Sequence, residues 1–303
     1  MIQTIPPAVR KQLGTQVMRV QRNFPYPIKN YIHCLPPIHT PTEGTLLVIL
    51  TQHKTFVEAL WTAYSWLKFL AEKPALRVVM DGDVTQVERR RFSKLFPNGT
   101  IESVEACVQY SAVRSYRAID NFYRLHKFGK LLMLKLALQY ERDILFSDPD
   151  VLVFQTPDEI IEQIKARSGC YFVEKNAFCV SDWIAKRAKQ LSLSLTKNFN
   201  AGVLFIPQNS LSLELCNTLL EGWSLDVPDY FPEQTICDVL MTAANANPLP
   251  TESYVVNNQG MLFWEKDADY RLIKIRHFVG NVRHRMYLSG YPMIKQILDA
   301  KEQ

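Results

Sequence analysis

The sequence lacks several features that would place it in a specialised class of protein. Its six cysteines lie far apart and form no Cys-x-x-Cys pair, so we interpret them as small buried residues of a reduced compartment. No apolar run approaches the roughly 20 residues that a membrane-spanning helix needs. Residues 1–10 contain no apolar segment of the kind found in signal peptides. We therefore predict a cytoplasmic protein without a transmembrane segment.

A basic block interleaved with aromatic residues is also absent, so nucleic acid is not an expected partner. The net charge of +5 over 303 residues is mildly basic, which suits anionic ligands, a membrane surface or an ordinary solvated face. Hydrophobic residues form 47% of the chain and aromatic residues 11%, so a sizeable core is expected rather than disorder. The chain contains no internal repeat and no low-complexity tract.

From residue 45 onwards, apolar runs alternate with segments of helical spacing. This alternation predicts an α/β fold in which helices flank a mostly parallel central sheet. We expect one Rossmann-like domain over residues 44–303. The predicted strands are 46–50, 76–80, 101–104, 144–146, 203–206 and 271–276, and the predicted helices are 55–70, 87–95, 116–140, 211–220 and 233–244.

Residues 1–43 differ from the rest and form a basic, proline-containing N-terminal arm. Five cations lie between Arg10 and Lys29, and prolines recur up to Pro41. We expect a short helix over 8–22 followed by an irregular connector. One interpretation is an arm that packs across the main domain. The other is a surface for an acceptor or for peripheral contact with a membrane.

The most informative stretch is 144–154, where Asp148 and Asp150 interrupt an apolar run. Buried anions are costly, so we expect the pair at the exposed end of a strand or beside a cation. Neighbouring carboxylates are also what a hard divalent metal requires. Two further Asp-x-Asp sequences have weaker contexts: 81–83 follows a predicted strand and indicates a turn, and 267–269 lies in a polar stretch that indicates a solvated turn. A loop that begins with a helix cap remains the alternative for 148–150.

Three more features follow in order along the chain. They are Phe199-Asn200-Ala201-Gly202 before a strand, Pro232-Glu233-Gln234-Thr235 at the start of a helix, and His277-Phe278-Val279-Gly280 after the last strand. Together with the carboxylate pair, this order resembles the GT-A-fold glycosyltransferases, and in particular the retaining family that includes glycogenin and bacterial lipooligosaccharide galactosyltransferases. The resemblance covers roughly residues 45–290 and leaves the arm unexplained.

The resemblance implies a metal site and a sugar-nucleotide site. Asp148, Asp150 and His277 would hold Mn²⁺ or Mg²⁺, and the metal would grip the diphosphate of the donor. Imidazole with two carboxylates suits Mn²⁺ better than Ca²⁺, which prefers oxygen ligands alone. The resemblance also implies a nucleoside-diphosphate sugar as donor, expected to be a UDP-sugar. The residues implied to contact this donor are Asp148, Lys130, Thr51, Gly280 and Arg283. Arg283 stands where the family usually has lysine, and His284-Arg285 replace its usual Pro-Trp.

For the reacting centre, the resemblance implies Asn200, Glu233 and Gln234. Asn200 would hydrogen-bond the donor sugar, and Glu233, in place of the family's usual Asp, would stabilise the cationic sugar together with Gln234. Each residue also has an ordinary structural interpretation. Asn200 suits a turn, Glu233 is an acid favoured in the first turn of a helix, and a histidine at a strand end such as His277 is commonly satisfied by hydrogen bonds alone.

These observations lead to one predicted function and two alternatives. The prediction is a metal-dependent glycosyltransferase (hexosyltransferase type) that retains the anomeric configuration and acts on an unidentified glycan, lipid-linked or protein acceptor. A haloacid-dehalogenase-type phosphatase also carries Asp-x-Asp after a hydrophobic strand, although Leu152 stands where that family has Thr or Val. The third possibility is a catalytically silent protein that binds sugar nucleotides.

Overall fold

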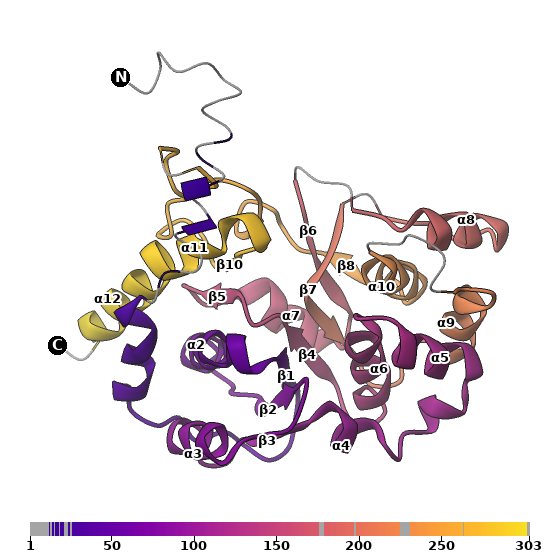
Figure 1. Ribbon diagram of the computed structural model, residues 1–303, viewed down its shortest axis with the longest axis horizontal. Helices are drawn as coiled ribbons and strands as arrows, with labels where there is room; N and C mark the ends of the chain where they lie inside the picture. The colour runs from indigo at the N-terminus through magenta and orange to yellow at the C-terminus, as the bar shows by residue number, and fades with distance from the viewer. Residues whose placement is uncertain are drawn as a thin grey trace.

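The computed structural model of the protein describes residues 12, 14, 16–17, 19–20, 24, 26–175, 179–196, 198–224, 231–262 and 264–301. Over these residues ten strands form two sheets, and helices connect the strands (Figure 1). The strands are β1 Leu46–Thr51, β2 Ala75–Met80, β3 Thr100–Ser103, β4 Ile144–Ser147, β5 Val151–Val153, β6 Cys170–Val173, β7 Phe199–Ile206, β8 Asn247–Pro248, β9 Tyr254–Val256 and β10 Ile275–His277.

Helical segments cover both faces of the larger sheet. The α-helices are α2 Phe56–Phe69, α3 Gln86–Leu95, α4 Val104–Val108, α5 Arg117–Leu125, α6 Gly129–Leu138, α7 Asp158–Ala166, α8 Asp182–Gln190, α9 Leu213–Leu220, α10 Pro232–Ala243, α11 Arg283–Arg285 and α12 Tyr291–Lys301. The short helical segments are η2 Pro27–Cys34, η3 His53–Thr55, η4 Ala112–Ser115, η5 Gly280–Val282 and the π-helical turn η6 Met286–Gly290.

The larger sheet has seven strands in the order β3-β2-β1-β4-β7-β6-β8. Strands β3, β2, β1 and β4 are mutually parallel, whereas β7 runs antiparallel to both β4 and β6. Because β1, β2 and β4 are parallel neighbours, their carboxyl ends meet at one edge of the sheet. In open α/β sheets this edge is where ligands bind. The predicted α/β fold with a mostly parallel, helix-flanked sheet is confirmed.

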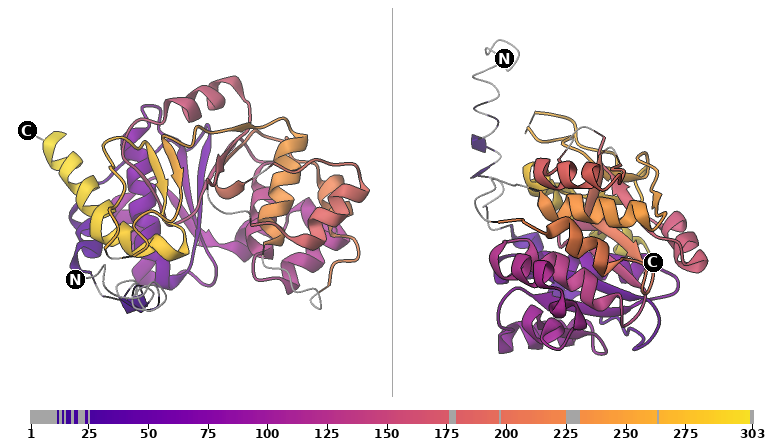
Figure 2. Two further views of the ribbon diagram at one scale, coloured as in Figure 1. Left: turned by 90° about the horizontal axis from the view of Figure 1, so that it is seen from above. Right: turned by 90° about the vertical axis from the view of Figure 1, so that its right-hand side faces the viewer.

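Alternate residues of β1 face two hydrophobic layers, as the pleat of a strand requires. Leu47 and Ile49 pack in the layer that contains α2 and α3, and Leu46 and Val48 pack in the layer that contains α6 and α10. All of these side chains are buried. Figure 2 shows helices on the two sides of the strands. The continuous apolar runs read from the sequence are therefore strands covered on both faces.

The smaller sheet has three strands in the order β5-β10-β9. β10 runs antiparallel to β5 and parallel to β9. Val151 of β5 and Ile275 of β10 belong to the same hydrophobic cluster as Leu47 of the larger sheet. The last strand was predicted over 271–276 but covers only Ile275–His277, because Arg271 precedes it in an exposed turn bound to Asp269.

The predicted single helix over 116–140 is wrong: α5 ends at Leu125 and α6 begins at Gly129. The His126 ring accepts a hydrogen bond from the backbone N–H of Phe128, which stabilises the break. A Cβ atom on Gly129 would lie 2.3 Å from the carbonyl oxygen of Phe122, so the two helices approach closely only because this residue is glycine. No strand or α-helix was predicted at β5, β6, β8, β9, α4, α7, α8, α11 and α12.

The described part of the N-terminal arm packs on the main body of the protein. The indole of Trp61 in α2 donates a hydrogen bond to the carbonyl of Lys29, and the Lys29 ammonium pairs with Glu58 at 2.9 Å. The Tyr31 hydroxyl also bonds to Asp299 of α12. Most of the helix predicted over 8–22 lies outside the described residues. Across the part of the chain that the structure describes, every helix falls short of the length and hydrophobicity that crossing a membrane would demand.

Candidate active site

A cavity of about 650 Å³ opens at the carboxyl edge of the larger sheet. Thr51 ends β1, Asp81 follows β2 and Asp148 follows β4, and all three line this cavity. Segments from the second half of the chain form the opposite wall, including Asn200, Gln234 and His277. The cavity therefore lies where the strand order predicts a ligand site.

The carboxylate turn is held by both sheets and by α2. The Asp148 N–H donates to the carbonyl of Gly202 in β7 at 2.7 Å, and the Phe278 N–H after β10 donates to the carbonyl of Asp150 at 2.7 Å. The Thr62 hydroxyl lies 2.8 Å from the carbonyl oxygens of Pro149 and Val151. Hydrogen bonds thus hold the backbone of Asp148, Pro149 and Asp150, and they fix the positions of the two carboxylates.

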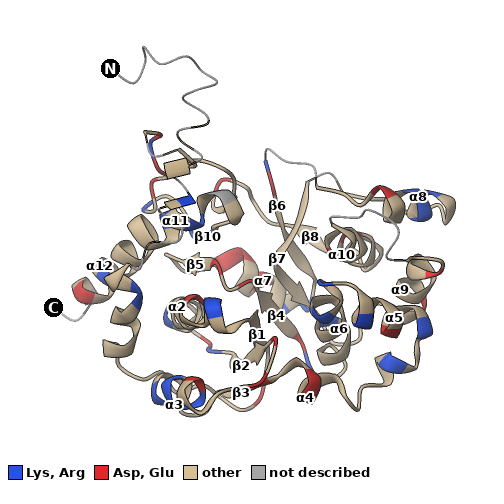
Figure 3. Ribbon diagram, viewed as in Figure 1, with Lys and Arg blue, Asp and Glu red and all other residues tan. Residues whose placement is uncertain are grey.

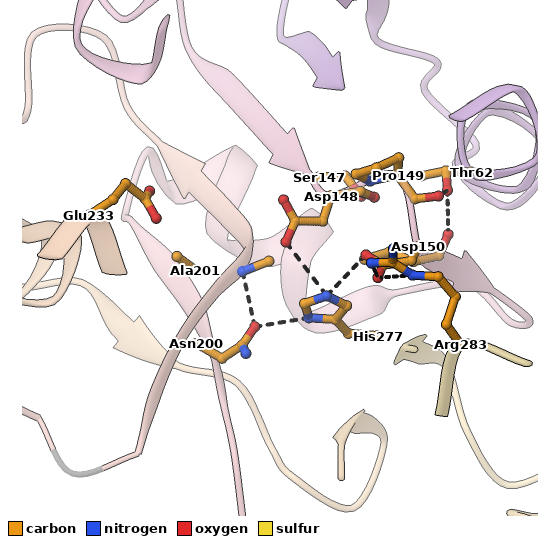
Figure 4. A network of polar contacts seen from close by, with 12 residues as sticks. Thr62, Ser147, Asp148, Pro149, Asp150, Asn200, Ala201, Glu233, His277 and Arg283 are labelled. Atoms are coloured by element: carbon orange, nitrogen blue, oxygen red, sulfur yellow. Dashed lines mark hydrogen bonds and ion pairs between the residues drawn. The ribbon is translucent and has the colours of Figure 1, made fainter. Parts of the chain in front are cut away.

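His277 meets both carboxylates from the end of β10 (Figure 4). Its Nε2 lies 3.1 Å from Asp150 Oδ1 and 3.5 Å from Asp148 Oδ2. The Asp150 and His277 side chains are only 5% and 7% exposed, whereas Asp148 is 28% exposed towards the cavity. Ligand atoms of all three residues lie within 4.8 Å of one another. The predicted meeting of Asp148, Asp150 and His277 is therefore present in the fold.

Asn200 determines which ring nitrogen of His277 carries a hydrogen. The Asn200 Oδ1 atom accepts a hydrogen bond from the Gly202 N–H at 2.9 Å and also lies 3.0 Å from His277 Nδ1. Because this oxygen is an acceptor, Nδ1 must be the donor. In the neutral imidazole, the lone pair is then on Nε2, which faces the carboxylates. This arrangement, with one nitrogen held by a second residue and the other left to bind, is typical of metal-ligating histidines.

Gly202 makes room for the His277 ring. A Cβ atom at this position would lie 2.3 Å from both Cε1 and Nδ1 of the imidazole. The backbone of Gly202 has no positive φ, so close approach of the ring, and not backbone conformation, requires glycine here. The Asn-x-Gly pattern therefore serves His277 twice, through the Asn200 oxygen and through the missing side chain of Gly202.

Arg283 binds Asp150 on the side opposite to His277. Its Nε donates to Asp150 Oδ2 at 2.9 Å, and its Nη2 contacts the same oxygen. Asp150 Oδ1 faces His277, so the two oxygens of the carboxylate have different partners. The resemblance implied that Arg283 contacts a diphosphate; in this structure it lies in the cavity wall but its guanidinium is bound to the carboxylate.

The protein environment shifts the pKa of each member of the cluster differently. Burial and the neighbouring Asp150 raise the pKa of Asp148, against the opposing effect of His277. Burial alone would raise the pKa of Asp150, but the charges of Arg283 and His277 outweigh it and hold that pKa below its usual range. Burial alone would lower the pKa of His277, yet the Asp150 and Asp148 carboxylates raise it.

The donor set of the cluster fits a divalent cation. A bound cation would take the place of the Nε2 proton between two carboxylates and a neutral imidazole. Carboxylate oxygens suit Mg²⁺ and Mn²⁺, and the added nitrogen favours Mn²⁺. The Asp148 carboxylate, which is the most exposed of the three protein ligands, faces the cavity, so a ligand from outside the protein could reach the ion there.

Among the predicted donor contacts, Thr51, Lys130 and Gly280 all line the cavity. The Thr51 hydroxyl bonds to Thr55 at 3.0 Å at the start of α2, so it also caps the strand end. The Lys130 ammonium pairs with Asp81 and Glu105, each at 2.8 Å. These two acids raise the pKa of Lys130, although burial opposes them. A Cβ atom at Gly280 would meet nothing within 4 Å, which leaves space for a ligand to approach the backbone.

Glu233 and Gln234 lie on different sides of the helix start. The Gln234 side chain lines the cavity and donates a hydrogen bond to the carbonyl of Cys179 at 3.0 Å. Glu233 is not among the residues that line the cavity. Its carboxylate forms a buried ion pair at 2.7 Å with Lys135 of α6 and accepts a hydrogen bond from Cys237. Figure 4 shows Glu233 apart from the bonded network around His277. Its pairing with Lys135 thus sets Glu233 back from the residues that line the cavity.

The sequence analysis missed two acids of the cavity wall. Asp81 belongs to the turn predicted after β2 and binds both Lys130 and Gln52. Glu174 follows β6, and its burial raises its pKa, although His277 and a hydrogen bond from Asn200 oppose that shift. Both acids come directly after a strand, as Asp148 does, and this shared position could have identified them. The third Asp-x-Asp was predicted to be solvated, which is wrong for Asp267, because its carboxylate pairs with the buried Arg276.

The fold resembles those of two solved glycosyltransferases. The bifunctional glycosyltransferase WbbM superposes with a TM-score of 0.53 at 14% identity over 88% of this chain, which spans 52% of the WbbM chain. Mouse xyloside xylosyltransferase 1 superposes with a TM-score of 0.52 at 11% identity over 81% of this chain and 99% of its own. No protein-family model and no curated protein matches the sequence. At these identities the likeness establishes the fold, and the predicted GT-A type of fold is confirmed.

Proposed function

We propose that the protein is a metal-dependent glycosyltransferase that moves a sugar from a nucleoside-diphosphate donor to an acceptor hydroxyl. The convergence of Asp148, Asp150 and His277 at the cavity carries this proposal. The fold supports it, since both WbbM and xyloside xylosyltransferase 1 are glycosyltransferases. The proposed cellular location is the cytoplasm, where cysteines stay reduced, and the six cysteines of this protein are free.

We assign the metal to the three converging side chains, with Mn²⁺ preferred over Mg²⁺. When bound, a divalent ion supplies Lewis-acid stabilisation of the charge on a departing diphosphate. Asn200 holds the His277 ring with its Nε2 directed at the carboxylates. The proposed donor is a UDP-sugar, the proposed outcome is retention, and both rest on the order of the motifs in the sequence.

Residues around the cluster would bind and orient the rest of the donor. Thr51 lines the part of the cavity that lies at the ends of β1 and β2, and we place the nucleotide of the donor there. Arg283 would stabilise the diphosphate by exchanging its contact with Asp150 for phosphate oxygens, which match the planar guanidinium. Asn200 and Gln234 face the region where the sugar would lie, so we keep them as its predicted contacts. Glu233 would act indirectly, by holding the start of α10 against Lys135.

Incubation of the purified protein with Mn²⁺ and a panel of radiolabelled nucleotide sugars tests the proposal. We expect slow hydrolysis of one donor, seen as release of free sugar, and its loss in the Asp150→Asn variant. An Arg142→Gln variant, altered far from the cavity, is the control. No turnover of any donor, together with Mn²⁺ affinity unaffected by Asp150→Asn, would overturn the assignment.

One observation favours the silent sugar-nucleotide-binding alternative: Arg283 already occupies one oxygen of Asp150. Saturable binding of UDP by calorimetry without hydrolysis of any UDP-sugar would support that alternative. The phosphatase alternative predicts release of phosphate from simple phosphomonoesters in the same preparation. It does not require His277 beside the two carboxylates, and no observation in the described residues specifically favours it.

A further inference from the structure

A second cavity has a volume of about 730 Å³. It shares no lining residue with the cavity that contains Asp148 and His277, which is called the cleft from here on. The second cavity is formed by α5, the preceding turn η4, the end of α9 and the residues that follow α9. Its wall contains Arg114, Arg117, Asp120, Arg124, Asn217 and Trp223. Figure 3 shows basic and acidic segments close together along α5.

The Asp120 carboxylate accepts a hydrogen bond from the Nε of two of the three arginines. The Arg114 Nε donates to Asp120 Oδ1 at 2.9 Å, and the Arg124 Nε donates to Asp120 Oδ2 at 2.7 Å. Within the described residues, the terminal Nη groups of both arginines have no hydrogen-bond partner. The carboxylate therefore orders two guanidinium groups while their outer donors stay available.

Two further groups of the wall, the Trp223 indole and the Asn217 amide, also offer N–H donors. Trp223 is only 5% exposed, yet its indole N–H has no hydrogen-bond partner among the described residues. Phe122 and His126 each contact the Trp223 ring in an edge-to-face geometry, which holds it in place. The Asn217 oxygen accepts the Ala118 N–H at 3.0 Å, which leaves the amide NH₂ of Asn217 as a further donor.

The charge of the wall is positive. Three arginines stand against Asp120 and Glu221, and Glu221 is already paired with Arg187, which is not part of the wall. Among these donors the Trp223 N–H is buried, and a buried donor without an acceptor costs free energy. A group rich in acceptor oxygens would supply an acceptor to several of the wall's donors at once. Guanidinium forks match phosphate oxygens in geometry as well as in charge.

We propose that this cavity binds a phosphate-bearing group at a site separate from the cleft. Arg114, Arg117 and Arg124 contact the phosphate oxygens, and the Trp223 indole donates to one of them. The inference does not depend on the proposed glycosyltransferase activity, because it uses no residue of the cleft. The same chemistry could be presented by a soluble phosphorylated compound or by the headgroup of an anionic lipid.

Calorimetric titration with inorganic pyrophosphate, in buffer containing EDTA to keep metal out of the cleft, tests the site. The variants are Arg117→Gln/Arg124→Gln and, as a milder change, Trp223→Phe. A matched control, Arg90→Gln/Arg91→Gln, removes the same two charges from exposed positions of α3. Thermal unfolding of each variant verifies that it is folded.

We expect the double cavity variant to bind pyrophosphate about tenfold more weakly or worse, since charge-assisted hydrogen bonds are lost. Trp223→Phe should weaken binding by a smaller factor, and the α3 control should match the wild type. Flotation with phosphatidylglycerol vesicles, compared with phosphatidylcholine vesicles, identifies a lipid source if the cavity variant alone fails to float. Equal behaviour of the cavity variant and the α3 control in both assays would overturn the proposal.

Discussion

Replacement of Gly202 by alanine should displace His277 and thereby weaken metal binding. The added Cβ would lie 2.3 Å from Cε1 and Nδ1 of the ring. Ordinary contacts between such atoms begin near 3.5 Å, so the imidazole must move by about 1 Å. His277 is buried and bonded on both sides, to Asn200 and to Asp150, so a shift of that size breaks its alignment.

The expected loss of Mn²⁺ affinity is at least as large as the loss caused by mutating a residue that orients a metal ligand. Such changes typically weaken metal affinity 10–100-fold, or about 1.4–2.8 kcal/mol. The measurement is titration of the purified variant with Mn²⁺, followed by electron paramagnetic resonance or calorimetry. Backbone strain does not complicate the result, because Gly202 has no positive φ.

Gly280→Ala is the matched control for this substitution. It adds the same methyl group beside the cavity, but its Cβ meets nothing within 4 Å. We expect its Mn²⁺ affinity to equal that of the wild type, and its affinity for UDP tests the predicted approach of the diphosphate to Gly280. A folded Gly202→Ala variant that binds Mn²⁺ as tightly as the wild type would refute the reasoning.

Three further predictions follow from the same structure. Asn200→Ala removes the acceptor that holds the His277 tautomer, so Mn²⁺ affinity should fall about tenfold in the same titration; an unchanged affinity would show that the tautomer is held by other means. Mn²⁺ affinity should also fall as pH falls through the raised pKa of His277, because only the unprotonated Nε2 binds metal, and a flat profile between pH 5 and pH 8 would contradict this. Lys135→Met leaves Glu233 buried without its partner, so the free energy of unfolding in urea should fall by about 3–5 kcal/mol; the double variant Lys135→Met/Glu233→Gln should recover part of the loss, and equal stability of both variants would contradict a coupled pair.

The parallel half of the fold could be predicted because its signals are local. Apolar runs with helices between them define β1, β2 and β4, β3 was expected one residue later than it lies, and the structure places each strand within a residue or two of the expected range. The small sheet could not be predicted in the same way. Its strands β5, β9 and β10 have three residues each, which is too short for a periodic pattern, and their partners lie far away in the sequence.

The candidate site divides along similar lines. Asp148, Asp150 and His277 were found because the motif order indicated that they meet. Glu233 was assigned to the reacting centre from the resemblance, in which an acidic residue precedes a glutamine. Lys135 lies in the otherwise apolar run of α6 and needs a buried anion, which Glu233 supplies. Lys130 was the basic residue expected at the donor, and it does line the cavity, whereas Lys135 pairs with Glu233 away from it. Such pairing of residues 98 positions apart is a tertiary property that no local pattern encodes.

The turn at Asp148–Asp150 has a mechanical consequence, because it joins two sheets. Asp148 is attached through its N–H to β7 of the larger sheet, and Asp150 is attached through its carbonyl to the residue after β10 of the smaller one. Any rotation of one sheet against the other would therefore change the separation of the two carboxylates. A cation held by both, and by His277 from β10, would lock the relative orientation of the sheets, so loading the ion should slow hydrogen exchange at the Asp148 and Phe278 amides together.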